Sequence, residues 1–146
     1  YFFDSNYRII SIVGSYLSYE FGYSGSGGAH PISGSWYRTI NIDTKEEVSL
    51  DELFTSESIM NVLLSDTNFT KHTENRHPKD LSDFVSSLGG GCEIRFDDLL
   101  VSYAITSVDK DVVTIEFGLT HGCEVMHGNF TTIDIVLPNQ QFKLTE

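Results

Sequence analysis

The sequence predicts an α+β domain, a mainly antiparallel sheet with two or three helices packed on one face, in the order strands, helices, strands. Apolar and polar residues alternate between residues 9 and 43 and again between residues 99 and 137, which is typical of strands. Helical spacing and helix cap signals fall between these two blocks. With 146 residues, 40% of them hydrophobic, the chain has the size of a single domain, 1–146.

The first block indicates two strands around a glycine-rich loop. From Ile9 to Phe21 the apolar residues recur at alternate positions, which predicts one long strand with a bulge near Gly14. A partner strand follows the loop, over residues 35–43. In that strand one set of alternate residues predicts an apolar face (Trp36, Ile40, Ile42) and the other a solvated face (Tyr37, Thr39, Asn41, Asp43).

The middle of the chain carries the helix signals. Ser49 is followed three residues later by Glu52, the capping-box spacing that begins a helix. Residues 59–64 continue an apolar helical stretch, and the polar residues 67–78 predict a loop or a ragged helix end. A further helix is predicted after Pro78 by the i, i+3, i+4, i+7 spacing of Leu81, Phe84, Val85 and Leu88, with three glycines as its stop.

The second block predicts a hairpin and one or two more strands. Alternation over residues 99–105 and 113–119, with a turn at residues 109–111, is typical of an antiparallel hairpin. Residues 133–137 predict a strand that ends before Pro138. Phe142 and Leu144 indicate a short last strand.

Charge limits the classes of partner. Nine Lys and Arg against 21 Asp and Glu give a net charge of −12, which repels nucleic acid and anionic lipid and attracts cationic partners. The same acidity also serves to keep an exported domain soluble. No apolar run approaches the ~20 residues of a membrane helix. The first ten residues lack the features of a signal peptide, so we expect a mature chain or an excised domain without a membrane span.

The two cysteines predict a disulfide. Cys92 and Cys123 are too far apart for a C-x-x-C pair, and both stand at loop-to-strand edges where a crosslink is sterically easy. A disulfide implies an oxidising compartment, and hence an extracytoplasmic location. The alternative is a cytosolic protein with two buried thiols, because free cysteine packs well as a small hydrophobe.

Potential metal ligands gather in the segment HGCEVMH, which contains His121, Cys123, Glu124 and His127. Together with Cys92 or His30 these donors would make a zinc site, but a disulfide at Cys123 excludes that role. One alternative function is therefore an envelope-associated, metal-dependent hydrolase that uses His30, His121 and His127. No G-x-S-x-G elbow or catalytic carboxylate pair is present, so we predict no catalytic residue, no metal and no cofactor.

The loop YSGSGGAHP, residues 23–31, resembles a phosphate-binding loop only in composition. It runs into Pro31 and a strand instead of opening a helix, which does not fit a phosphate cradle. Pro31 holds His30 in extended geometry. His30 therefore either hydrogen-bonds the loop backbone or acts as a recognition residue at the rim of the sheet.

Aromatic residues crowd the two strands that border this loop, and aromatic side chains dominate protein–protein hot spots. Alternation sends half of them into the core, and the outward set is a candidate binding surface. The predicted ligand-binding residues are Tyr23, Gly27, Gly28, His30, Trp36 and Tyr37.

The first third of the chain resembles the RsiV-like extracytoplasmic domain, a domain of unknown function. The similarity lies in a serine- and tyrosine-bearing strand, a G-G-A-H-P turn, a strand of the form Y-x-T-x-N-x-D and a V-S-L-x-E-L-F helix. In this chain these elements are Ser11 with Ser18 and Tyr19, Gly27 to Pro31, Tyr37 to Asp43, and Val48 to Phe54.

The resemblance implies an extracytoplasmic bacterial module without catalysis of its own, located in the periplasm or at the cell surface. The domain is similar to the lysozyme-binding part of an anti-sigma factor and also occurs attached to peptidoglycan deacetylases. Lysozymes are strongly cationic, which suits an acidic partner. We therefore expect a non-catalytic binding or sensing domain that recognises a cell-envelope ligand, such as peptidoglycan, or a cationic wall-lytic enzyme such as lysozyme.

Overall fold

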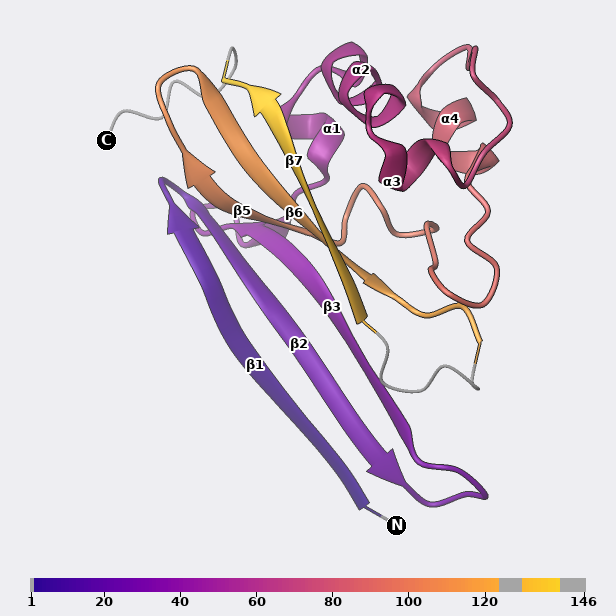
Figure 1. Ribbon diagram of the computed structural model, residues 1–146. Helices are drawn as coiled ribbons and strands as arrows, with labels where there is room; N and C mark the ends of the chain where they lie inside the picture. Colours follow the sequence, from indigo (N-terminus) through magenta and orange to yellow (C-terminus); the bar gives the residue numbers. More distant parts are fainter. Residues whose placement is uncertain (1, 124–129, 140–146) are drawn as a thin grey trace.

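The computed structural model describes residues 2–123 and 130–139, which form two antiparallel sheets with short helices between them (Figure 1). The strand order is β1-β2-β3-β4 in the first sheet and β5-β6-β7 in the second. The predicted α+β class and the order strands, helices, strands are confirmed.

The first sheet consists of β1 (Phe2–Val13), β2 (Tyr16–Ser26), β3 (Ile32–Asn41) and the short β4 (Glu46–Glu47). The prediction of one long strand through Gly14 is wrong, because the chain reverses there and Val13 pairs with Tyr16. Gly14 adopts φ +57°, which glycine tolerates at the first position of a two-residue hairpin loop. The alternating residues therefore belong to two neighbouring strands.

Four short helices follow in the described part of the chain: α1 (Leu50–Leu53), α2 (Ser56–Ser65), α3 (Thr67–Thr70) and α4 (Leu81–Ser87). Two or three helices were predicted, and α1, α2 and α4 lie where helical patterns were seen. The additional single turn, α3, lies in the segment predicted as a loop or a ragged helix end. The predicted capping box is present at α1, where the backbone N–H of Ser49 donates to the Glu52 carboxylate at 2.7 Å. None of the described helices is long and apolar enough to span a membrane.

The second sheet consists of β5 (Tyr103–Val108), β6 (Val112–Thr120) and β7 (Phe130–Pro138). The predicted hairpin and the strand before Pro138 are confirmed. The first strand begins later than predicted, because Leu99 and Val101 lie in turns that bury Leu99 against the core. The predicted last strand at Phe142 and Leu144 lies outside the described residues.

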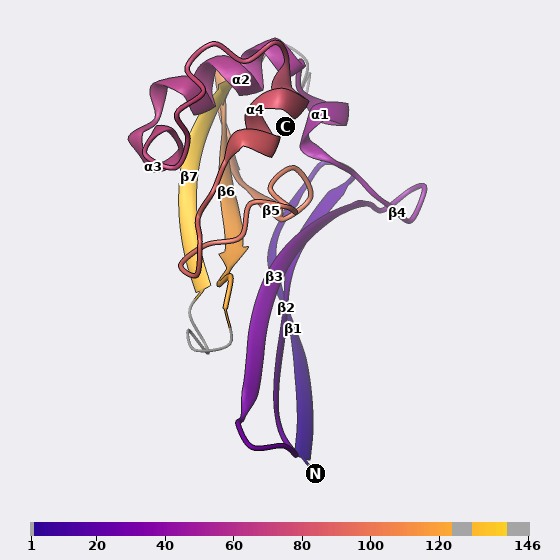
Figure 2. The ribbon, with the colours of Figure 1, turned by 90° about the vertical axis from the view of Figure 1, so that its right-hand side faces the viewer.

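The hydrophobic core lies between the helices and the second sheet, where α2 packs against β7. Among the described residues, every buried hydrophobic side chain except Tyr37 comes from position 50 or later. The first sheet therefore contributes mainly partly buried side chains to the core, among them Val13 and Tyr16. Figures 1 and 2 both show β1–β3 extending well beyond the ends of β5–β7.

Hydroxyl groups join the first sheet to the edge of β5. The Ser18 hydroxyl accepts a hydrogen bond from the Ile105 backbone N–H at 3.0 Å, and the Thr39 hydroxyl donates to the Tyr103 carbonyl at 3.0 Å. The Ser11 hydroxyl donates to the Ile105 carbonyl. These side-chain hydroxyls thus form the hydrogen bonds to the β5 backbone that a neighbouring strand would otherwise form.

Because of these hydrogen bonds, the buried face of β3 is the one that was predicted to be solvated. The residues predicted to be solvated, Tyr37 and Thr39, face the second sheet and are 3% and 1% exposed. Trp36 and Ile40 point the other way, away from the second sheet. Alternation showed that β3 has two faces but not which face is covered, because the second sheet is distant in sequence.

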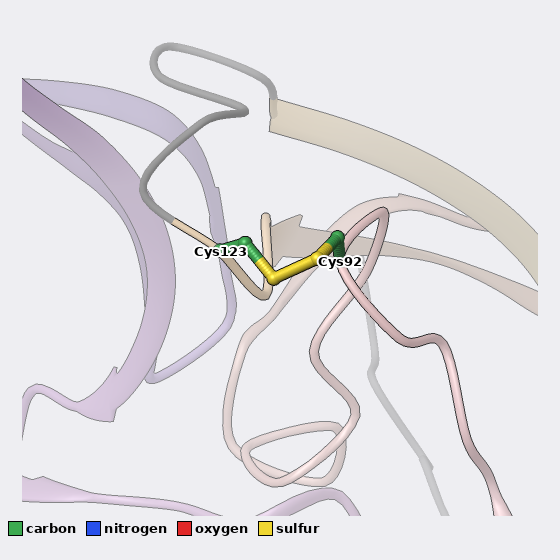
Figure 3. The surroundings of a disulfide bond; sticks show 2 residues. All are labelled: Cys92 and Cys123. Carbon is green, nitrogen blue, oxygen red and sulfur yellow. A yellow bond between two sulfur atoms is a disulfide. The ribbon is translucent and has the colours of Figure 1, made fainter.

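The predicted disulfide between Cys92 and Cys123 is present (Figure 3). It links the loop after α4 to the segment that follows β6. Two backbone hydrogen bonds run alongside it, from the Gly122 N–H to the Cys92 carbonyl at 2.9 Å and from the Arg95 N–H to the Thr120 carbonyl at 2.9 Å. The bond is consistent with an oxidising compartment.

Candidate binding surface

One face of the first sheet is covered with aromatic side chains. In the antiparallel register Phe21 lies opposite both Tyr7 of β1 and Trp36 of β3, so these three side chains share a face. Side chains two positions further along each of these strands lie on the same face. We call this surface the aromatic face and define it by six residues: Phe3, Tyr7, Tyr19, Phe21, Tyr23 and Trp36.

The rings of the aromatic face touch one another across all three strands. Phe21 is central, with its ring centroid 4.4 Å from that of Trp36 and 4.8 Å from that of Tyr7. Tyr23 lies 5.7 Å from Trp36 and 6.2 Å from Phe3. These separations are those of favourable aromatic pairs, so the rings hold one another in place before any partner arrives.

The aromatic face is exposed along β1 and half-buried along β2 and β3, where Tyr19, Phe21, Tyr23 and Trp36 lie. Phe3 is 65% and Tyr7 is 71% exposed, and Ile9 beside them is 62% exposed. The second sheet lies along one side of β1–β3 (Figure 2), and Ser18, Tyr37 and Thr39, which contact it, have the opposite strand parity to the aromatic residues. A contiguous exposed apolar patch is uncommon on a soluble domain and marks an interaction site.

The aromatic face carries little charge. Arg38 is the cation of β3 on this side, with its guanidinium 5.9 Å from the Trp36 ring centroid, a cation–π arrangement. The same guanidinium lies 3.7 Å from the Glu47 carboxylate. The chain has a net charge of −12, but none of the six residues that define the aromatic face is acidic.

The opposite face of the same strands is polar. The Glu20 carboxylate accepts hydrogen bonds from the Ser35 hydroxyl at 2.5 Å and from Arg8, whose nitrogen lies 2.5 Å from its oxygen. Partial burial opposes ionisation of Glu20, but the hydrogen bonds from Ser35 and Arg8 outweigh it and lower its pKa. The strands therefore have one apolar and one polar face along their exposed length.

The structure separates the predicted ligand-binding residues into three places. Tyr23 and Trp36 belong to the aromatic face. Gly27, Gly28 and His30 lie in the exposed turn between β2 and β3, at the far end of the sheet.

Tyr37 lies on the other face, where its hydroxyl donates to the Glu116 carboxylate at 2.6 Å. Burial, followed by this hydrogen bond, raises the pKa of Tyr37. Tyr37 joins the two sheets and does not reach the aromatic face.

Phe3 and Tyr7 belong to the aromatic face and were not predicted. A sequence signal was present, because Phe3, Tyr7 and Ile9 keep the period of a strand from the start of the chain. It becomes visible only once Gly14 is recognised as a hairpin loop, which makes residues 2–13 a strand in its own right.

The predicted metal ligands are dispersed or lie outside the described residues. His30 lies in the β2–β3 turn, His121 follows β6, and Cys123 is bound in the disulfide. Glu124 and His127 fall outside the described residues. Within residues 2–123 and 130–139, no three His, Cys, Asp or Glu side chains gather closely enough to hold a metal ion.

Comparison with protein-family models finds none that matches the chain, and comparison with curated proteins finds no match. The similarity to the RsiV-like domain therefore remains a prediction from the residues of the first third of the sequence.

Proposed function

We propose that this chain is a non-catalytic, extracytoplasmic binding domain that recognises a cell-envelope ligand or a cationic wall-lytic enzyme such as lysozyme. The observation that carries the proposal is the open aromatic face, with six rings in mutual contact on strands that extend beyond the core. Aromatic side chains of this kind dominate binding energy at protein interfaces.

Charge supports a cationic partner. A net charge of −12 accelerates the encounter with a basic protein and weakens as salt screens it. The uncharged aromatic face then supplies short-range apolar contacts that salt does not screen. The acidic charge should therefore mainly affect the rate of encounter, and the aromatic contacts should mainly affect the stability of the bound complex.

The disulfide supports an extracytoplasmic location, because such bonds persist in oxidising compartments. The resemblance to the RsiV-like domain, which implies a cell-envelope module, agrees with this. No reaction is assigned to the domain.

Titration with hen lysozyme by calorimetry tests the proposal, first at low ionic strength and then at about 0.15 M salt, where the Debye length is about 8 Å. We expect binding at low salt that weakens as salt is added. Tyr7→Ser should reduce affinity at least tenfold, because Tyr7 is exposed and has no role in the core.

Val136→Ser is the matched control, since Val136 is 51% exposed but lies on β7 of the second sheet. This variant should bind like the wild type. No heat of binding at about 100 µM lysozyme and low salt would reject the lysozyme version of the proposal. Equal losses in both variants would reject the aromatic face as the binding surface.

A further inference from the structure

The outer edge of β1 is an unpaired strand edge in the described part of the chain. β1 pairs with β2 on one side only, and it is the outermost strand of the first sheet (Figure 1). The N–H and C=O groups along such an edge are a template for another strand, and native proteins usually cover or disrupt long edges. This edge stays regular from Phe2 to Ile9, where the register shift of a bulge ends it.

The sequence of this edge is complementary to itself when read in reverse. In Phe3-Asp4-Ser5-Asn6-Tyr7-Arg8-Ile9 an acid stands two residues before Asn6 and a base two residues after it. An antiparallel pairing centred on Asn6 places Asp4 opposite Arg8 of the second strand, and Phe3 opposite Ile9. Opposite charges facing across a ladder stabilise pairing, whereas a parallel pairing in register would set like charges together.

We propose that two copies of this chain associate through their β1 edges, in an antiparallel pair with its two-fold axis at Asn6. A two-fold interface requires one self-complementary patch, which residues 3–9 provide. The partner is a second copy and not an unrelated strand, because both the charge pattern and the apolar pattern of the edge match their own reverse.

The rest of the fold is compatible with this pairing. The second sheet first meets β1 at Ser11, through its hydrogen bond to the Ile105 carbonyl, and Ser11 lies beyond the paired segment. The two cores therefore lie at opposite ends of the shared ladder. The paired segment contains one acid and one base, so it adds no net charge to the contact between two chains of net charge −12.

Asp4 is available for such a contact. It is exposed and has no ion pair among the described residues, while Arg8 is 64% exposed at its side chain and holds Glu20 on the neighbouring strand. In the pair, Arg8 would lie between Glu20 of its own chain and Asp4 of the second copy. Residues opposite one another share a face, so the aromatic faces of the two copies would join into one surface.

Sedimentation equilibrium over about 10–500 µM protein in about 0.15 M salt, where charge repulsion is screened, tests the association. We expect a monomer–dimer equilibrium in the wild type. Asp4→Lys sets a cation opposite Arg8 twice per dimer and should raise the dissociation constant at least tenfold. Glu57→Lys makes the same charge change on exposed α2 and should leave the dissociation constant equal or lower, because it only reduces net repulsion.

A crosslink tests the register. Asn6→Cys should form an intermolecular disulfide under mild oxidation, because residues at the two-fold axis of a ladder have Cα atoms about 4.5–5.5 Å apart. Ser24→Cys is the control on β2, opposite Asp4, where the two copies would be three strand spacings or about 14 Å apart across the ladder and further apart again along it, too far to crosslink.

A monomer at every concentration, or equal crosslinking of the two cysteine variants, would overturn the inference. Circular dichroism and native mass confirm that each variant is folded with its own disulfide intact. The inference does not rest on the proposed function: lysozyme binding by a strictly monomeric chain would refute the β1 pairing alone, and a dimer that binds no lysozyme would refute the function alone.

Discussion

The hydroxyl joint between the two sheets can be tested by removing the Ser18 hydroxyl. Ser18 is fully buried, and its Oγ accepts the Ile105 backbone N–H at 3.0 Å and lies 2.8 Å from the Thr39 hydroxyl. In Ser18→Ala the Thr39 hydroxyl keeps the Tyr103 carbonyl as acceptor, but the Ile105 N–H loses its partner. A buried donor left without a partner costs about 1–3 kcal/mol.

The expected loss for Ser18→Ala is therefore about 2 kcal/mol in the free energy of unfolding. For 146 residues the entropy of unfolding near the midpoint is about 0.3 kcal/mol/K, so the melting temperature should fall by about 6–7 °C. Urea unfolding followed by circular dichroism measures the change as a lower midpoint with an unchanged slope.

Ser24→Ala, on the exposed end of the same strand, is the control and should change stability by less than about 0.5 kcal/mol. A Ser18→Ala protein within about 0.5 kcal/mol of the wild type would refute the reasoning that side-chain hydroxyls satisfy the β5 edge.

Three further predictions concern other parts of the molecule. Replacing both cysteines by serine opens a link across a sequence separation of 31 residues and should cost about 3–4 kcal/mol, measured by urea unfolding; an unchanged midpoint would contradict it. The pKa of Glu20 in the folded protein lies below 4.5, so its stabilising contribution is lost as the pH falls below that value. The difference in free energy of unfolding between the wild type and Glu20→Gln should therefore narrow from about pH 5 to 3. A constant difference would refute this. Gly34→Val should lower the melting temperature and partner affinity, because a Cβ there would lie 2.6 Å from the Tyr23 ring, whereas Gly28→Val, with open space around it, should change neither.

The fold class could be predicted because period and cap signals are local. The capping box at Ser49 and the glycine stop after Leu88 each concern a few neighbouring residues, and α1 begins and α4 ends where these signals predict. The disulfide could also be predicted, although Cys92 lies in a turn of the loop after α4 and not at the edge of a strand as expected.

The binding surface could be predicted only in part. Tyr23 and Trp36 were found because aromatic residues crowd β2 and β3, but the covered face of β3 depends on β5, more than 60 residues away in sequence. Tyr37 was therefore assigned to the surface although it joins the sheets. Phe3 and Tyr7 were missed because a single glycine at position 14 could be interpreted as a bulge or as a hairpin loop.

Partner binding at the aromatic face can be followed directly at Trp36, because it is the only tryptophan in the chain. Protein labelled with 5-fluorotryptophan should give one ¹⁹F resonance, from a ring in contact with Phe21 and Tyr23. Titration with lysozyme or with soluble peptidoglycan fragments at low salt should shift or broaden that resonance in step with the heat of binding. Saturable binding by calorimetry with an unmoved Trp36 resonance would contradict binding at the aromatic face and place the contact elsewhere on the molecule.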